Sequence, residues 1–119
     1  MIKLMLFMSR RKDLSREEFR QYYETRHAPL AAANVPHLRG YVRNYVVDQF
    51  SDDLDSDCVS EFWFDVNGSW RELQDTVLPK GVMQMLAEDE VNFIDRSTMR
   101  MVVVEEMATP PADLKRLFE

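Results

Sequence analysis

The sequence has one cysteine, Cys58, and only two histidines, His27 and His37, among its 119 residues. A single cysteine cannot form a disulfide within the chain, so a disulfide-stabilised secreted scaffold is not indicated. The two histidines do not match a common zinc-site spacing, and glycine-rich phosphate-binding motifs are missing. We therefore expect a protein that works without a metal or nucleotide, with no cofactor.

Positive charge is also scarce. Fifteen Lys and Arg residues stand against 21 Asp and Glu residues, which gives a formal net charge of -6. A net negative chain is poorly suited to nucleic acid, so no nucleic-acid partner is expected. The apolar N-terminal stretch is too short to span a membrane and lacks the features of a signal peptide. We expect a cytoplasmic protein with no membrane partner.

The length allows one domain with one core. We expect this domain to cover residues 1–107 and a C-terminal tail to cover residues 108–119, because Pro110 and Pro111 end the regular pattern. Residues 48–57 carry five aspartates, which repel one another and predict a solvated loop. This loop lacks the glycine and distal glutamate of an EF-hand, so a calcium site is not favoured.

Hydrophobic periodicity predicts four strands and two helical regions. The strands are expected at 2–8, 39–47, 58–65 and 97–107, and the helices at 15–28 and 70–95 with a break at Pro79. The order β-α-β-β-α-β is typical of the ferredoxin-like fold, an α+β fold with a four-stranded antiparallel sheet. Helices cover one sheet face, yet three strands are apolar on both faces. We therefore expect a homodimer joined through the sheet faces.

The first predicted helix carries a histidine on its apolar side. Spacings of three and four residues place six side chains on one stripe: Phe19, Tyr22, Tyr23, Arg26, His27 and Leu30. His27 is also expected at the helix C-terminus, because Pro29 disfavours helical backbone before it. The macrodipole favours imidazolium and burial favours neutral imidazole, so His27 is a candidate to move protons near neutral pH. The alternative is a structural histidine bonded to a carbonyl or a tyrosine.

Five other side chains are candidates for substrate contact: Tyr23, Tyr41, Asn44, Glu61 and Trp63. Tyr41 and Asn44 lie on opposite faces of one strand, so at most one of them faces the same pocket as His27. Either one can donate a hydrogen bond to a substrate oxygen that develops negative charge. The structural alternatives are packing for Tyr41 and Trp63 and an ion pair for Glu61.

The order and spacing of several segments resemble a known family. The segments are Phe19 with Tyr22, Arg26–Leu30, Leu38–Tyr41 with Asn44, Glu61–Asp65, Asp89–Asp95 and Val103–Glu106. Together they are similar to the EthD family of dimeric α+β barrel proteins. The resemblance implies a ferredoxin-like fold, a sheet-to-sheet dimer and a pocket between sheet and helices. It also marks His27, in the motif H-x-P-L, as a possible acid/base group.

We expect a small cofactor-free enzyme that uses acid/base chemistry, such as isomerisation or dehydration, on an apolar oxygenated or aromatic small molecule. Two alternatives are open, because a shared fold does not fix function. One is a non-catalytic accessory protein that binds a small molecule. The other is an oxidoreductase of the monooxygenase or haem type, for which His27 or His37 would be the axial haem ligand.

Overall fold

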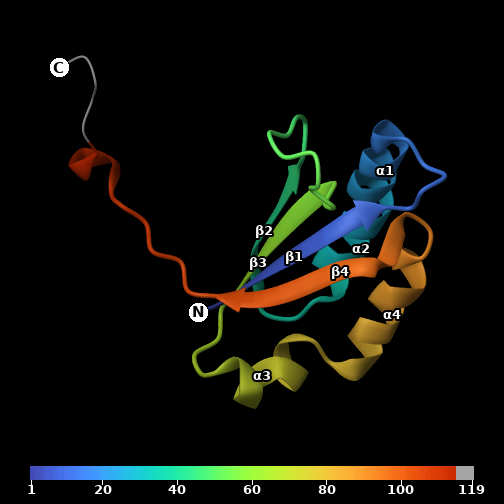
Figure 1. Ribbon diagram of the computed structural model, residues 1–119. Helices are drawn as coiled ribbons and strands as arrows, with labels where there is room; N and C mark the ends of the chain where they lie inside the picture. Colours follow the sequence, from blue (N-terminus) through green and yellow to red (C-terminus); the bar gives the residue numbers. More distant parts are fainter. Residues whose placement is uncertain (115–119) are drawn as a thin grey trace.

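The computed structural model describes residues 1–114. Its helices and strands follow the order predicted from the sequence (Figure 1). They are β1 (Ile2–Arg10), α1 (Arg16–Tyr22), a π-helical turn (Tyr23–His27), α2 (Ala28–Asn34), β2 (Leu38–Tyr45), β3 (Cys58–Phe64), α3 (Trp70–Val77), α4 (Lys80–Glu90) and β4 (Ile94–Val104). A short 3-10 turn, Pro111–Asp113, comes after β4.

The four strands form one antiparallel sheet in the order β2-β3-β1-β4. Helices lie against one face of this sheet and leave the other face open (Figure 1). This architecture confirms the predicted ferredoxin-like α+β fold. No helix within residues 1–114 is both long enough and apolar enough to cross a membrane.

The chain after β4 extends away from the sheet (Figure 1). Residues 105–114 are all exposed, and Pro111–Asp113 among them form the 3-10 turn. The predicted tail at 108–119 therefore lies partly outside the described residues. Its proposed separation from a domain at 1–107 stays a prediction.

Helix α1 begins with a capping box formed by Ser15 and Glu18. The Ser15 hydroxyl accepts from the amide of Glu18 at 3.1 Å, and the Glu18 carboxylate accepts from the amide of Ser15 at 3.0 Å. Such a cap stabilises a helix by about 1 kcal/mol. It fixes where the helix starts, and so fixes which residues of this helix face the sheet.

The first helical region is longer than predicted. It was expected to end near Ala28, but α2 continues the helix to Asn34. In the π-helical turn the amide of Ala28 donates to the carbonyl of Tyr23, five residues back. Pro29 then lies in the first turn of α2, a position at which a helix tolerates proline. The proline is accommodated and does not end the helix.

The second helical region is shorter than predicted. Helix α4 ends at Glu90, and β4 begins at Ile94, inside the expected helix at 80–95. The amides of Asn92 and Phe93 close a turn on the carbonyls of Asp89 and Glu90, each at 3.1 Å. Phe93 and Ile94 are both buried in the core. Their apolar character reflects core packing after the turn, and it does not extend the helix.

A bulge interrupts the pairing of β1 with β4. Phe7 is paired with Arg100 and Ser9 with Asp95, so four residues of β4, 96–99, lie opposite one residue of β1. The hydroxyl of Thr98 fixes this bulge, because it accepts from the amide of Ser9 at 2.9 Å and donates to the carbonyl of Asp95 at 2.6 Å. Bulges bend a strand and redirect its side chains.

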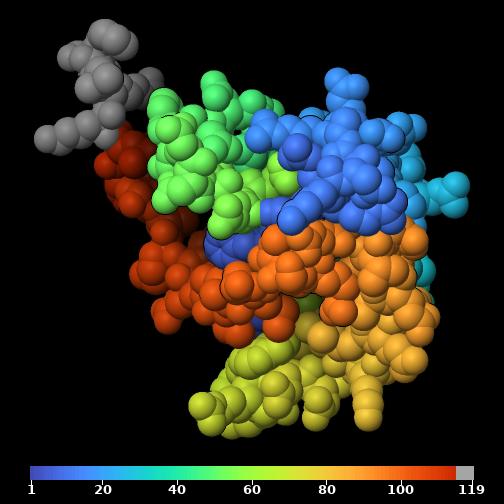
Figure 2. Space-filling view, turned by 45° about the vertical axis from the view of Figure 1, so that its right-hand side comes forward, coloured from blue at the N-terminus to red at the C-terminus, as the bar shows by residue number. Residues whose placement is uncertain are grey.

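Directly paired residues share a sheet face, so the register assigns the face without helices, here called the open face. Its residues are Lys3, Met5, Phe7, Val42, Asn44, Val59, Glu61, Trp63, Arg100, Val102 and Val104. At one end of the sheet, the acidic loop at 48–57 stands next to the end of β1 (Figure 2). Asp57 joins the two segments, because its carboxylate accepts from the Arg10 guanidinium at 2.7 Å.

Candidate functional site

A cavity of about 350 Å³ lies between the sheet and the helices, and is here called the sheet–helix cavity. Most of its wall is aliphatic or aromatic, with methionines at positions 8, 83, 99 and 101. Five polar side chains also line it: Tyr23, His27, Tyr41, Glu90 and Arg96. An apolar cavity of this size with a few converging polar groups has the make-up of a small-molecule site.

The π-helical turn brings two of these polar groups into the cavity. Tyr23 is 1% exposed and His27 is 4% exposed, and their rings meet edge to face at 5.6 Å. The turn adds one residue to a helical repeat, which shifts the side chains that follow it around the helix axis. His27 therefore lies within a continuous helical segment, and not at a helix C-terminus as predicted. The helix macrodipole does not act on it as expected.

His27 is held by a carboxylate on the neighbouring helix. Its Nδ1 lies 2.8 Å from Oδ2 of Asp89, which comes from α4. The same carboxylate accepts from the hydroxyl of Tyr22 at 2.7 Å. A carboxylate can only accept here, so Nδ1 carries the hydrogen and Nε2 is left as the unprotonated nitrogen of the neutral ring.

The surroundings favour this neutral form. Burial lowers the pKa of His27 below its ordinary value of 6.5, and the Asp89 carboxylate opposes the shift only in part. Burial on its own raises the pKa of Asp89, but hydrogen bonds from Tyr22 and His27 outweigh it and leave this pKa lowered. The pair is thus an ionised carboxylate beside a neutral imidazole, the arrangement that orients a histidine base.

A second carboxyl group lies on the other side of the ring. Oε2 of Glu90 is 3.9 Å from Nε2 of His27, and its Oε1 accepts from Nε of Arg96 at 3.2 Å. The Glu90 side chain is 9% exposed. Burial raises the pKa of Glu90, while Arg96 acts in the opposite direction. A carboxyl group with a raised pKa can hold a proton and later donate it.

Two tyrosines form a hydrogen-bonded chain across the cavity. The hydroxyl of Tyr41 donates to that of Tyr23 at 2.7 Å, and Tyr23 also lies 2.7 Å from the hydroxyl of Ser60. Burial raises the pKa of Tyr23 and of Tyr41, so both remain protonated hydrogen-bond donors. Cys58, next to Ser60, is fully buried, and burial raises the pKa of its thiol to about 11, which opposes any role as a nucleophile.

The structure brings Tyr23 and Tyr41 together with His27, but places the other three predicted contacts on the open face. Glu61 lies 2.8 Å from the ammonium of Lys3 and accepts from the amide nitrogen of Asn44 at 3.0 Å. The Lys3 ammonium also lies 4.4 Å from the centre of the Trp63 ring. The sheet separates these residues from the sheet–helix cavity. Tyr41 and Asn44 therefore face opposite ways, as the strand period predicts.

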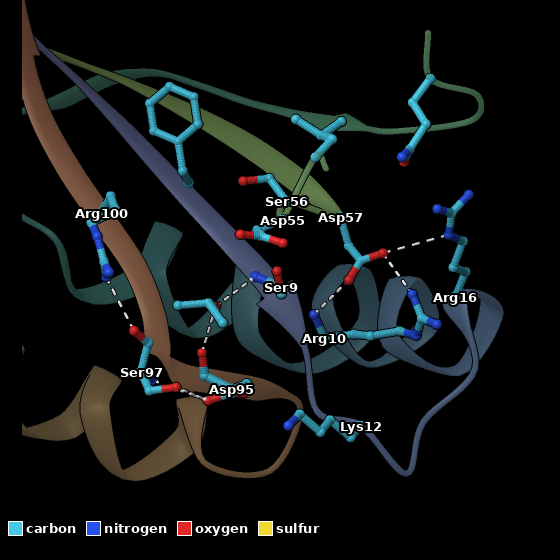
Figure 3. Close-up of a pocket in the computed structure, with 14 residues that line it drawn as sticks. Ser9, Arg10, Lys12, Arg16, Asp55, Ser56, Asp57, Asp95, Ser97 and Arg100 are labelled. Carbon is cyan, nitrogen blue, oxygen red and sulfur yellow. Dashed lines mark hydrogen bonds and ion pairs between the residues drawn. The ribbon is translucent and has the colours of Figure 1, made fainter. Parts of the chain in front are cut away.

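A larger and more open depression, here called the polar hollow, lies at the end of β1 beside the acidic loop (Figure 3). Some of its charged groups are held by other polar groups that line the hollow. Asp57 accepts from Arg10 at 2.7 Å and lies 3.5 Å from Arg16. On the opposite side, the hydroxyl of Ser97 donates to Asp95 at 2.6 Å (Figure 3). These contacts hold loops together, whereas the sheet–helix cavity carries titratable groups turned toward empty space.

Three functional candidates, Asp89, Glu90 and Arg96, were not identified from the sequence. A signal existed for Glu90, because it follows Met83 and Leu86 at spacings of seven and four residues and so falls on the apolar side of its helix. A charged residue on an apolar stripe is a candidate for a perturbed pKa. Asp89 and Arg96 gave no such local signal. The position of Asp89 in the site depends on a contact between two helices, and that of Arg96 depends on the bulge.

The two histidines do not fit a haem site. Oε2 of Glu90 lies 3.9 Å from Nε2 of His27, in the place where iron would have to approach this nitrogen. His37 is exposed and does not line the sheet–helix cavity. Within residues 1–114, no three His, Cys, Asp or Glu side chains are arranged to hold a metal ion.

Comparison with known proteins places this chain in a family. The model of the EthD domain matches residues 11–97, while among curated protein sequences none matches this chain. An EthD family protein from Bacillus halodurans is 18% identical, with 90% of this chain and 100% of that chain covered and a TM-score of 0.66. A cofactor-independent oxygenase from Streptomyces nogalater is 14% identical, with coverages of 92% and 96% and a TM-score of 0.55.

A dimeric protein with a ferredoxin-like fold from Bacteroides fragilis is 10% identical to this chain. The alignment covers 88% of this chain and 95% of that chain, with a TM-score of 0.56. At such low identities these structures share the fold alone. The family model spans most of the chain, from before the first helix to the start of β4. The chain therefore belongs to the EthD family.

Proposed function

We propose that this protein is a small enzyme that moves protons on an apolar, oxygenated or aromatic small molecule bound in the sheet–helix cavity. One observation carries the proposal: Asp89 holds Nδ1 of a buried, neutral His27, and the free Nε2 is left beside Glu90 at the cavity wall. A base whose tautomer is fixed by a carboxylate is a recurring arrangement in acid/base catalysis.

The proposed reaction begins when Nε2 of His27 removes a proton from a carbon next to a substrate carbonyl. The electron pair of the broken C–H bond moves into the carbonyl, whose oxygen becomes negative. The hydroxyl of Tyr41 can rotate to donate to this oxygen. Asp89 stabilises the imidazolium that has formed.

The second proton transfer completes the reaction. In an isomerisation, the imidazolium returns its proton to a different carbon of the enolate. In a dehydration, protonated Glu90 donates to a leaving hydroxyl, which departs as water as the double bond forms. Burial raises the pKa of Glu90 and so favours its protonated form. These two outcomes need no group beyond the side chains of the cavity.

The most direct test follows proton transfer without needing the natural substrate. Small ketones, lactones, quinones and phenols are first screened for thermal stabilisation of the wild type. For each stabilising carbonyl compound, exchange of the adjacent hydrogen for deuterium in D₂O is then followed by NMR. We expect His27→Ala to slow exchange by about 10²- to 10⁴-fold. Equal exchange rates in His27→Ala and wild type would refute the proposal and favour a binding protein.

The control variant is Glu61→Gln, which removes a carboxylate on the open face. Glu61 is separated from the cavity by the sheet and pairs with Lys3 at 2.8 Å. We expect its exchange rate to stay within about twofold of wild type, because Glu61 does not line the cavity in which exchange takes place. The comparison separates a loss of chemistry from a general effect of removing a titratable group.

We further propose that two copies of the chain associate through their open faces. Val42 and Val102 lie there and are 42% and 43% exposed, an apolar surface that a second sheet would cover. The fold neighbour from Bacteroides fragilis is described as dimeric. Light scattering after size exclusion should give a dimer mass for wild type and a monomer mass for Val102→Asp. A monomeric wild type at micromolar concentration would contradict this proposal.

A further inference from the structure

The wall of the sheet–helix cavity carries one positive side chain. Among the described residues that line it, Arg96 is the only lysine or arginine. Its side chain is 50% exposed, so the guanidinium stands where the cavity meets solvent. The remaining wall is largely apolar. A cation at the edge of an apolar cavity is suited to a ligand whose body is apolar and whose single anionic group stays near water.

Arg96 reaches the cavity because of the bulge in β4. The bulge places residues 96–99 out of register with β1, between the pairs Ser9–Asp95 and Phe7–Arg100. Polar contacts fix its shape, and Figure 3 shows one of them, the hydroxyl of Ser97 turned toward Asp95. Bulges often redirect a side chain beside a functional site. The regular pairing of β1 with β4 is thus interrupted at Arg96, the residue that supplies the positive charge of the cavity.

Arg96 has hydrogen-bonding capacity to spare. A guanidinium has five N–H donors, and within residues 1–114 only Nε of Arg96 has a partner, Oε1 of Glu90 at 3.2 Å. The two Nη atoms present the flat pair of donors that binds a carboxylate through both of its oxygens. The contact with Glu90 also fixes the stem of the side chain, which reduces the entropy lost when the Nη atoms bind an anion.

We propose that the sheet–helix cavity binds a small carboxylate with an apolar body, and that the Nη atoms of Arg96 bind its carboxylate group. Glu90 connects Arg96 to His27 along one wall, at 3.2 Å and 3.9 Å respectively. A ligand anchored at Arg96 thus extends past His27 into the apolar part of the cavity. This inference relies on the proposed function for the use of the cavity as a substrate site, but not on the catalytic role of His27.

The test compares a carboxylate with neutral analogues of the same shape. The probes are 1-naphthylacetate, its primary amide and its methyl ester, and binding is measured by isothermal titration calorimetry. We expect wild type to bind the carboxylate more tightly than the amide and the ester. Arg96→Gln should weaken carboxylate binding by roughly 10- to 100-fold, the value of a charge-assisted pair, and leave the amide nearly unchanged.

Two further variants sharpen the result. Arg71→Gln removes the same charge from an exposed position on α3 that does not line the cavity, and should leave carboxylate binding within about twofold. Glu90→Gln removes a group that competes for Arg96 when it is ionised, and should not weaken carboxylate binding. Equal losses in Arg96→Gln and Arg71→Gln would show an effect of net charge alone and would overturn the proposal.

Failure of this inference is distinguishable from failure of the proposed function. If the ester and amide bind as well as the carboxylate, or if no probe binds at all, the anionic subsite is refuted whatever His27 does. If carboxylate binding depends on Arg96 while His27→Ala leaves deuterium exchange unchanged, the anionic subsite is supported and the acid/base function is refuted.

Discussion

The two faces of one sheet hold their charged groups in opposite ways. On the open face, Lys3 lies between Glu61 and Glu106 at 2.8 and 2.9 Å, and these hydrogen bonds raise the pKa of Lys3 and lower that of Glu61. Every group is favoured in its charged form. On the face under the helices, burial lowers the pKa of His27 and raises that of Glu90. Both groups are pushed toward their neutral forms.

This difference shows where proton transfer is feasible. An ion pair in which each partner stabilises the charge of the other resists giving or taking a proton near neutral pH. A histidine and a carboxyl group whose burial shifts their pKa values toward each other, downward for His27 and upward for Glu90, are better placed to exchange protons. A charged side chain on a sheet face is thus a poor indicator of a catalytic site. A titratable side chain whose charged form is disfavoured by burial is a useful one.

The largest expected effect concerns the Asp89–His27 pair. Asp89→Asn keeps the size of the side chain but no longer favours hydrogen on Nδ1, so we expect deuterium exchange to slow by about 10- to 100-fold. His27→Ala should slow it further, and the double variant should be no slower than His27→Ala alone, because the two residues act as one unit. Exchange rates of the three variants test this. Multiplicative losses in the double variant would mean that Asp89 acts independently of His27.

A smaller effect distinguishes hydrogen bonding on the two faces. Ser60→Ala leaves the buried hydroxyl of Tyr23 with one partner in place of two, and we expect a loss of about 1–2 kcal/mol in the free energy of unfolding. Asn44→Ala removes hydrogen bonds on the exposed side of the sheet and should cost less than about 0.5 kcal/mol. Urea unfolding measures both. Similar losses for the two variants would show that burial does not separate the faces.

The smallest effect is the dependence of stability on pH. The pKa of folded His27 lies below 6.5, so between that pKa and 6.5 the unfolded chain binds more protons than the folded chain. Wild type should therefore lose stability relative to His27→Gln as the pH falls below 6.5. On the open face, Lys3 lowers the pKa of Glu61 below 4.5, so wild type should lose stability relative to Glu61→Gln only below pH 4.5. Unfolding curves at several pH values measure the pH range over which wild type loses stability relative to each variant. The same pH range for both variants would contradict the difference between the two faces.

Much of the fold could be predicted from patterns along the chain. The hydrophobic periodicity of the strands and helices led to the ferredoxin-like order, and the family segments agreed with it; the structure confirms this order. The helix ends were less accurate, because tertiary packing overrode local signals. Pro29 indicates a helix end by itself, but the π-helical turn accommodates it. Phe93 and Ile94 continue an apolar pattern, but they pack in the core after a turn.

The site was predictable only in part. His27, Tyr23 and Tyr41 follow from helix and strand periods, which also place Asn44 on the face opposite Tyr41. Which sheet face the helices cover decides where Glu61 and Trp63 point, and no local pattern fixes that choice. Asp89 and Arg96 reach the cavity through a contact between helices and through a bulge, both of which depend on the assembled fold.

The measurement that tests the central claim most directly is the protonation state of His27, read from the ¹⁵N chemical shifts of its ring during a pH titration. The protein has two histidines, so His37→Gln assigns the signals. We expect hydrogen on Nδ1, an unprotonated Nε2 and a pKa below 6.5. Hydrogen on Nε2 in the neutral ring, or a pKa above 6.5, would contradict the role of His27 as a neutral base held by Asp89.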